Sequence, residues 1–174
     1  MQLIILHGFG AHPDSNFFQW LKNEFPNVHV PQLPDTDNPS EEQVDFVLKN
    51  IEITKDTVLL GHSLGAVVAL KVAEKIPVKG LITVGGFLEP KFKDRRRVFE
   101  TNFRWSFDFT KIKNNAKKII ILSDRNDYAI PLEQGRLLAE KLNGTLIETT
   151  AEKPHFTGEK EPWVLDAVQS YIIL

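Results

Sequence analysis

One pentapeptide, GHSLG at residues 61–65, constrains the fold of this chain more than any other segment. The apolar residues 57–60 before it are typical of a buried strand. Residues 66–76 after it are apolar on nearly every side, as in a helix buried against a sheet. The two glycines let the strand and the helix approach closely, because glycine has no Cβ atom. The pattern predicts a sharp strand–turn–helix unit with Ser63 strained at the helix N-terminus.

This pattern is rare enough to carry a functional interpretation. With 10 glycines and 6 serines among 174 residues, G-x-S-x-G is expected by chance about 0.02 times. A helix N-terminus also favours the negative charge that develops on the substrate oxygen during acyl transfer. We therefore interpret Ser63 as a nucleophile rather than as a serine in an ordinary tight turn.

Elsewhere, short apolar runs alternate with amphipathic stretches, which is typical of strand–helix units that build a parallel sheet. The strands are expected at residues 3–6, 28–30, 57–60, 81–84, 119–122 and 145–147. Helices are expected at 15–25, at 44–51 behind a capping box at Ser40 and Gln43, at 66–76, from Pro131 to Gly144, and from Pro162, where the apolar stripe ends at Ile172. We predict one α/β domain over residues 1–174, a three-layer sandwich with a mostly parallel sheet of about six strands.

Residues 86–116 do not fit this alternation, because about thirty positions separate two strands where about a dozen suffice. The segment is aromatic and basic. Residues 91–118 hold ten Lys or Arg and three acidic residues, a local charge of +7 that leaves −9 on the rest of the chain. Since ligands bind at the carboxyl ends of such strands, we predict a lid-like insertion with Phe87 and Trp105 as candidate substrate contacts. The basic run RRR at 95–97 also suits an anionic partner, although a solvated helix face is the commoner origin.

The composition excludes several classes of site. The chain has no cysteine, which excludes a disulfide framework, a zinc ribbon, an iron–sulfur cluster and a thiol nucleophile. Its five histidines lack paired metal-ligand spacing, and no apolar run approaches the roughly 20 residues of a membrane span. The apolar N-terminus lacks the basic flank of a signal peptide. We expect a cytoplasmic protein with no metal or organic cofactor and no membrane contact, and the acidic remainder argues against nucleic-acid binding.

A nucleophilic serine needs a base, and the base needs an orienting acid. His155 is the only histidine after Ser63, and it lies between the last strand pattern and the last helix pattern. Asp124 and Asp127 both follow the strand pattern at residues 119–122, and spacing alone does not choose between them. For the oxyanion we expect two backbone donors, the amides of Leu64 and Phe9.

Two other histidines lie close to these residues in the sequence. His7 stands at the end of the first strand pattern, directly before the glycines of the loop that carries Phe9. His62 stands within the pentapeptide itself. We interpret both as structural residues that order their turns.

Taken together, these motifs resemble the α/β-hydrolases, in particular the small serine hydrolases of the retinoblastoma-binding protein 9 type and their bacterial relatives. The likeness covers the whole chain: the His-Gly pair at 7–8, the aromatic stretch FFQWL at 17–21, the pentapeptide, the S-x-x-x-D segment at 123–127 before Ile130-Pro131, and the His-Phe pair at 155–156. The resemblance implies Asp127 as the acid of a Ser63, Asp127 and His155 triad. The chain departs from the family in having Pro154 where glycine usually precedes the histidine.

The resemblance implies a carboxylesterase-like serine hydrolase that cleaves small carboxylic esters through an acyl-enzyme. Amide and thioester hydrolysis use the same set of residues and remain alternatives. A further alternative is a protein-interaction module on a hydrolase fold, with the basic aromatic insertion as the surface for a protein partner.

Overall fold

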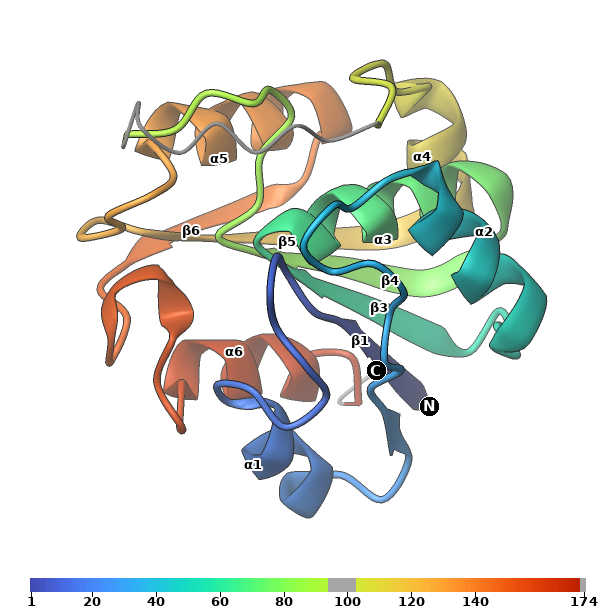
Figure 1. Cartoon of the computed structure of the whole chain (residues 1–174), viewed down its shortest axis with the longest axis horizontal. Helices are drawn as coiled ribbons and strands as arrows, with labels where there is room; N and C mark the ends of the chain where they lie inside the picture. Colours follow the sequence, from blue (N-terminus) through green and yellow to red (C-terminus); the bar gives the residue numbers. More distant parts are fainter. Residues whose placement is uncertain (94–102, 173–174) are drawn as a thin grey trace.

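The computed structural model describes residues 1–93 and 103–172 (Figure 1). The strands are β1 (Gln2–Leu6), β2 (Val28–His29), β3 (Thr57–His62), β4 (Val78–Val84), β5 (Ala116–Asp124) and β6 (Thr145–Thr149). The helices are α1 (Phe18–Glu24), α2 (Glu41–Asn50), α3 (Leu64–Lys75), α4 (Phe109–Asn115), α5 (Leu132–Leu142) and α6 (Pro162–Gln169), with a short 3₁₀ turn, η1, at Pro154–Phe156.

The six strands form one sheet in the order β2-β1-β3-β4-β5-β6, and every neighbouring pair is parallel. Figure 1 shows α1 and α6 on one face of the sheet and α2, α3, α4 and α5 on the other. The predicted three-layer sandwich is therefore confirmed, with each expected strand present. Because all strands run the same way, the loops that follow them meet at one edge of the sheet.

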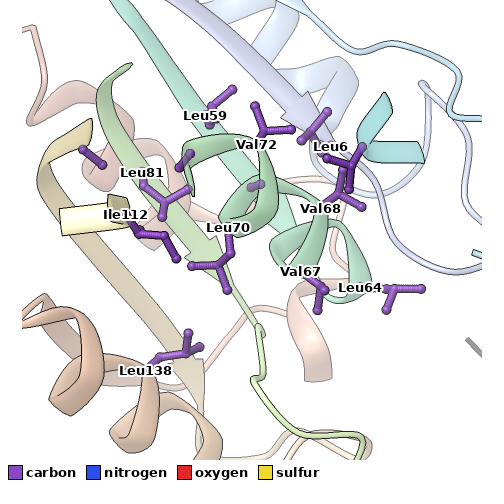
Figure 2. Close-up of a cluster of buried hydrophobic side chains, with 14 of the residues drawn as sticks. Leu6, Leu59, Leu64, Val67, Val68, Leu70, Val72, Leu81, Ile112 and Leu138 are labelled. Atoms are coloured by element: carbon purple, nitrogen blue, oxygen red, sulfur yellow. The ribbon is translucent and has the colours of Figure 1, made fainter. Parts of the chain in front are cut away.

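Alternate residues along each strand enter two separate cores. Ile4, Leu59 and Leu81 pack on the side of α3, whereas Leu3, Val58 and Ile82 pack on the side of α1 and α6. Helix α3 lies at the centre of the first core, where its valines and leucines meet Leu6, Leu59, Leu81, Ile112 and Leu138 (Figure 2). Burial on both faces explains why these strands read as continuous apolar runs.

Close approach of β3 and α3 depends on the two glycines of the pentapeptide. A Cβ atom at Gly65 would overlap the carbonyl group of Leu6, and one at Gly61 would overlap the backbone of Ala66. The helix can therefore lie directly against the sheet, and this contact sets the position of the turn between them.

Three helix ends differ from the sequence expectations. Helix α1 begins at Phe18, three residues later than predicted. Ser40 does cap α2, by accepting the amide of Glu42 at 3.2 Å, but the Gln43 side chain donates to the carbonyl oxygen of Pro34, so the reciprocal half of the capping box is not formed. Helix α6 ends at Gln169, and Ile172 beyond it is 52% exposed rather than part of the buried stripe.

The insertion contains the crossover helix α4, which packs against α3. The described residues on both sides of 94–102 are bonded to the body of the protein. The side chain of Gln134 accepts the amides of Leu88 and Glu89, and the Lys71 ammonium donates to the carbonyl oxygen of Ser106. Residues 95–97, the predicted anionic contact, lie outside the described residues, and the lid remains a prediction.

No helix in the described part of the chain is both long and apolar enough to span a membrane.

Candidate active site

Ser63 occupies the turn between β3 and α3 with φ 55° and ψ −122°. Positive φ is strained for a residue with a Cβ atom, and here the neighbouring backbone maintains it. The Ser63 amide donates to the carbonyl oxygen of Val84 at 2.8 Å, and the Ser63 carbonyl accepts the amide of Ala66 at 3.0 Å. The serine is thus held rigidly at the N-terminus of a buried helix.

His155 and Asp127 form a buried pair. Nδ1 of His155 lies 2.7 Å from Oδ2 of Asp127, and the two residues are only 6% and 3% exposed. The other carboxylate oxygen, Oδ1, accepts the amides of Ala129 at 2.7 Å and Ile130 at 2.8 Å. Because an ionised carboxylate only accepts, Nδ1 carries the proton and the lone pair of neutral His155 lies on Nε2.

Asp124, the other acid that spacing left open, does not reach the imidazole ring. Its carboxylate accepts three backbone amides, those of Asn126, Ala151 and His155, at 3.0, 3.2 and 2.9 Å. The structure therefore brings Asp127 to the ring and Asp124 to the main chain of the same histidine.

Gly85 makes room for the pair. Its φ is 56°, and a Cβ atom there would lie 3.2 Å from Nδ1 and Cε1 of His155 and 3.5 Å from Oδ2 of Asp127. Sequence reasoning missed this residue. The available signal was the pair Gly85-Gly86 directly after the strand pattern at 81–84. A glycine pair indicates a turn, but it does not indicate which side chains pack against that turn.

The loop after β1 lies against the serine turn. A Cβ atom at Gly8 would come within 3.0 Å of Cβ of Ser63 and 3.5 Å of the amide nitrogen of Leu64. Phe9, the next residue, and Leu64, the first of α3, are the two predicted oxyanion donors. The structure therefore brings the backbone segments that carry both of them beside Ser63.

His7 orders this loop. Its Nε2 accepts the amide of Leu33 at 3.0 Å, so the neutral ring carries its proton on Nδ1, which lies 3.3 Å from the carbonyl oxygen of Gly8. Burial lowers the pKa of His7 below its usual value. A neutral ring with a hydrogen-bond partner at each of its two nitrogens suits the structural role that the sequence suggested.

His62 is also held neutral. Burial, together with the neighbouring His155, lowers the pKa of His62 to about 3. Its Nε2 lies 2.9 Å from the carbonyl oxygen of His155, and since a carbonyl only accepts, Nε2 carries the proton. His62, the residue directly before Ser63, is therefore hydrogen-bonded to the main chain of His155.

A pocket of about 630 Å³ adjoins these groups. Its walls include Ser63 and His155, together with the apolar side chains of Phe9, Phe92 and Ile130. The pocket can admit a small ligand with an apolar portion and present its polar end to Ser63.

Phe87 and Trp105, the predicted substrate contacts, are not among the described residues of the pocket wall. Phe87 is fully buried and packs edge-on against Phe92, with ring centroids 5.1 Å apart, and Trp105 lies behind it at 5.9 Å. Phe92 thus lines the pocket while Phe87 supports it from the core. The sequence marked the aromatic segment, but only packing distinguishes its members.

Within residues 1–93 and 103–172, no group of three or more His, Cys, Asp or Glu side chains is placed to hold a metal ion.

The serine hydrolase family matches residues 3–162. The YdeN protein of Bacillus subtilis (strain 168) is 26% identical over 187 residues, which cover 98% of this chain and 95% of that protein. Serine hydrolase RBBP9 of Rattus norvegicus is 25% identical over 130 residues, covering 73% of this chain and 67% of that protein.

The crystal structure of the B. subtilis ydeN gene product superposes with a TM-score of 0.85 at 24% identity, covering 99% of both chains. This likeness confirms the predicted α/β-hydrolase fold. The family match covers most of the chain and includes the turn at Ser63 and the pair formed by His155 and Asp127. The chain therefore belongs to the serine hydrolase family.

Proposed function

We propose that this serine hydrolase cleaves small carboxylic esters, with Ser63 as nucleophile, His155 as general base and Asp127 as the acid that orients the imidazole. The observation that carries the proposal is the 2.7 Å contact between His155 and Asp127 beside a pocket that Ser63 also lines. With Nδ1 bonded to the carboxylate, Nε2 is the nitrogen that can exchange a proton with the serine.

The reaction has two steps. In the first, Oγ of Ser63 attacks the carbonyl carbon while its proton passes to Nε2 of His155. The ester C–O bond then breaks, and the alcohol leaves with that proton. In the second, water attacks the acyl-enzyme, His155 takes a proton from the water and returns it to Ser63, and the carboxylic acid departs. The amides of Leu64 and Phe9 stabilise the oxyanion in both steps.

The pocket supports a substrate with an apolar group. Phe9, Phe92 and Ile130 surround the space next to Ser63, and a cavity of about 630 Å³ accommodates a short or medium acyl chain or a small aryl alcohol. Burial of each methylene contributes about 0.8 kcal/mol, so catalytic efficiency should rise with acyl length until the pocket is filled.

The test combines covalent labelling with turnover of a short-chain aryl ester. We expect a fluorophosphonate probe to label the protein at Ser63, and both labelling and ester hydrolysis to be lost in Ser63→Ala. Ser106→Ala, at an exposed serine away from the pocket, is the matched control and should behave as wild type. Undiminished hydrolysis by Ser63→Ala would show that the assignment is wrong.

The same assay separates the alternatives. A panel of esters, amides and thioesters with one acyl group identifies the preferred bond, since all three share this chemistry. Folded protein that takes up no probe and turns over none of these substrates would favour the protein-interaction module, whose basic run at 95–97 lies outside the described residues.

A further inference from the structure

His155 is held in an unfavourable backbone conformation. Its φ and ψ are 64° and 24°, and the next residue, Phe156, also has a positive φ of 52°. Two consecutive left-handed residues with Cβ atoms are strained, so other groups must maintain this shape. Pro154 opens this same short turn.

Asp124 holds the backbone of His155 from one side. Its Oδ2 accepts the amide of His155 at 2.9 Å, while its Oδ1 accepts the amides of Asn126 and Ala151. Asp124 is the last residue of β5 and is 2% exposed, so this carboxylate is fixed relative to the sheet. It precedes Asp127 by three residues and thus couples the main chain of His155 to the loop that orients its ring.

His62 holds the same residue from the other side. Its Nε2–H donates to the carbonyl oxygen of His155 at 2.9 Å. Its ring also packs edge-on against Phe17 and Phe18, with centroids 5.6 and 6.0 Å away. Because His62 directly precedes Ser63, this bond spans the nucleophile turn and the histidine loop.

We propose that Asp124 and His62 are positioning residues that clamp the main chain of His155 and thereby aim its Nε2 at Ser63. The bond to Asp127 fixes only Nδ1, about which the ring can pivot, whereas the clamp fixes the peptide groups on both sides of the side chain. Without it the strained turn relaxes and Nε2 moves away from the serine. This inference rests on the proposed function, because it assigns His155 the role of base.

Glu161 provides a matched control. It is fully buried and, like Asp124, its carboxylate accepts three backbone amides of the same loop, from Glu152, Lys153 and Gly158, at 3.0, 3.2 and 2.9 Å. It accepts none from His155. A variant at Glu161 therefore shows how a loosened loop changes stability and activity. A variant at Asp124 shows the same effect together with the loss of the hydrogen bond to the main chain of His155.

The experiment compares Asp124→Asn with Glu161→Gln in the intact chain. Melting temperature, kcat and KM for a short-chain aryl ester, and the rate of fluorophosphonate labelling are measured for each. We expect both variants to melt at lower temperature by similar amounts. In folded protein, only Asp124→Asn should lose activity, with kcat and the labelling rate falling about a hundred-fold at nearly unchanged KM, as expected when a reacting atom is displaced by about 1 Å.

A second pair tests the other half of the clamp and applies even if Asp124→Asn does not fold. His62→Leu removes the donor to the carbonyl of His155, whereas His62→Gln keeps an N–H that can donate. We expect kcat to be lower in His62→Leu than in His62→Gln, which should keep part of the activity of the wild type. The two variants should have similar melting temperatures, so a difference in stability does not account for the difference in kcat.

The outcomes separate the two claims. Wild-type protein that is not labelled at Ser63 contradicts the proposed function itself. Wild-type protein that is labelled, with Asp124→Asn and Glu161→Gln equally active, overturns the clamp while leaving the function intact. Equal activity of the two His62 variants would also count against it.

Discussion

At the scale of the residue, the site depends on a few atoms whose partners are distant in the sequence. The two carboxylates near His155 are three residues apart, yet Asp127 binds the ring and Asp124 binds the main chain. Their roles differ because β5 ends at Asp124, whose carboxylate there meets main-chain amides, while the following turn carries Asp127 to the imidazole. Both residues are aspartates that stand close together at the end of the same strand, and only the path of the backbone gives the two carboxylates different partners.

Asp127→Asn should abolish most activity while the fold remains. The amide oxygen of asparagine can still accept the amides of Ala129 and Ile130, but its NH₂ group would donate to Nδ1 of His155. The histidine would then carry its proton on Nε2, the wrong nitrogen for a base. We expect kcat to fall by roughly 10⁴-fold with a nearly unchanged melting temperature. A loss below ten-fold, measured by steady-state ester hydrolysis, would contradict the assignment.

Gly85→Ala should impair the site, and Gly86→Ala serves as its control. A methyl group at Gly85 strains a positive φ and crowds His155, whereas one at Gly86 would meet Cβ of Ala66 at 2.7 Å, within the core. We expect both variants to lose about 1–3 kcal/mol of unfolding free energy, measured in urea. Only Gly85→Ala should also lose at least about ten-fold in kcat. Equal kcat values in folded protein would show that the space beside His155 is not needed.

At the scale of the element, the basic insertion is connected to the body of the protein on both sides of residues 94–102. The segment that follows residue 102 is held by the side chain of Lys71, a buried residue of α3 that also contacts α2. Its ammonium donates to the carbonyl oxygen of Ser106 at 2.8 Å, lies 3.5 Å from Glu41, and stands 4.9 Å from the ring centroid of Phe107. A lysine in the buried part of α3 therefore fastens the segment that leads into α4.

Lys71→Met should lower stability without altering catalysis. The variant keeps an apolar stem of similar length but leaves the Ser106 carbonyl without this donor. We expect a loss of about 1–3 kcal/mol in unfolding free energy, measured by urea denaturation, and kcat within a factor of about two. Lys75→Met, at an exposed position on the same helix, should change stability by less than about 0.5 kcal/mol. A similar loss in both variants would show that Lys71 does not fasten the segment.

At the scale of the whole molecule, two neutral buried histidines make folding sensitive to acid. Burial lowers the pKa of His7, and lowers that of His62 to about 3, whereas both titrate near 6.5 in the unfolded chain. Below about pH 6.5 the unfolded state therefore binds more protons than the native state, and stability falls as the pH is lowered towards 3. Above pH 6.5 neither group changes the stability.

His62→Gln should reduce this acid sensitivity. In the wild type, His62 alone contributes a slope of up to about 1.4 kcal/mol per pH unit between about pH 6.5 and 3. Urea unfolding at pH 7 and pH 5 should show a smaller loss of stability in His62→Gln than in the wild type. His29→Gln, at an exposed position in β2, is the matched control and should keep the slope of the wild type. An unchanged slope in His62→Gln would mean that folding does not lower the pKa of His62.

The sequence by itself determined the order of the six strands and of helices α1, α2, α3, α5 and α6, the turn that carries Ser63, and the one histidine that follows that serine in the chain. It did not predict helix α4 within the insertion. These features depend on contacts close in the chain: apolar runs that match a strand, glycines that permit a tight turn, and caps that end a helix. They are local, so they can be read from neighbouring residues. The resemblance to a hydrolase family extended the prediction to Asp127.

Spacing alone left two carboxylates open, and the tertiary structure showed that Asp127 meets the imidazole ring. Only the tertiary structure also showed why Gly85 must be small and that Phe92 rather than Phe87 lines the pocket. The bonds to His155 come from residues 28, 31 and 93 positions away, and they meet because a parallel sheet brings the ends of β3 and β5 to one edge. No local pattern encodes such a meeting. The strained backbone of His155 exists only because these distant groups hold it.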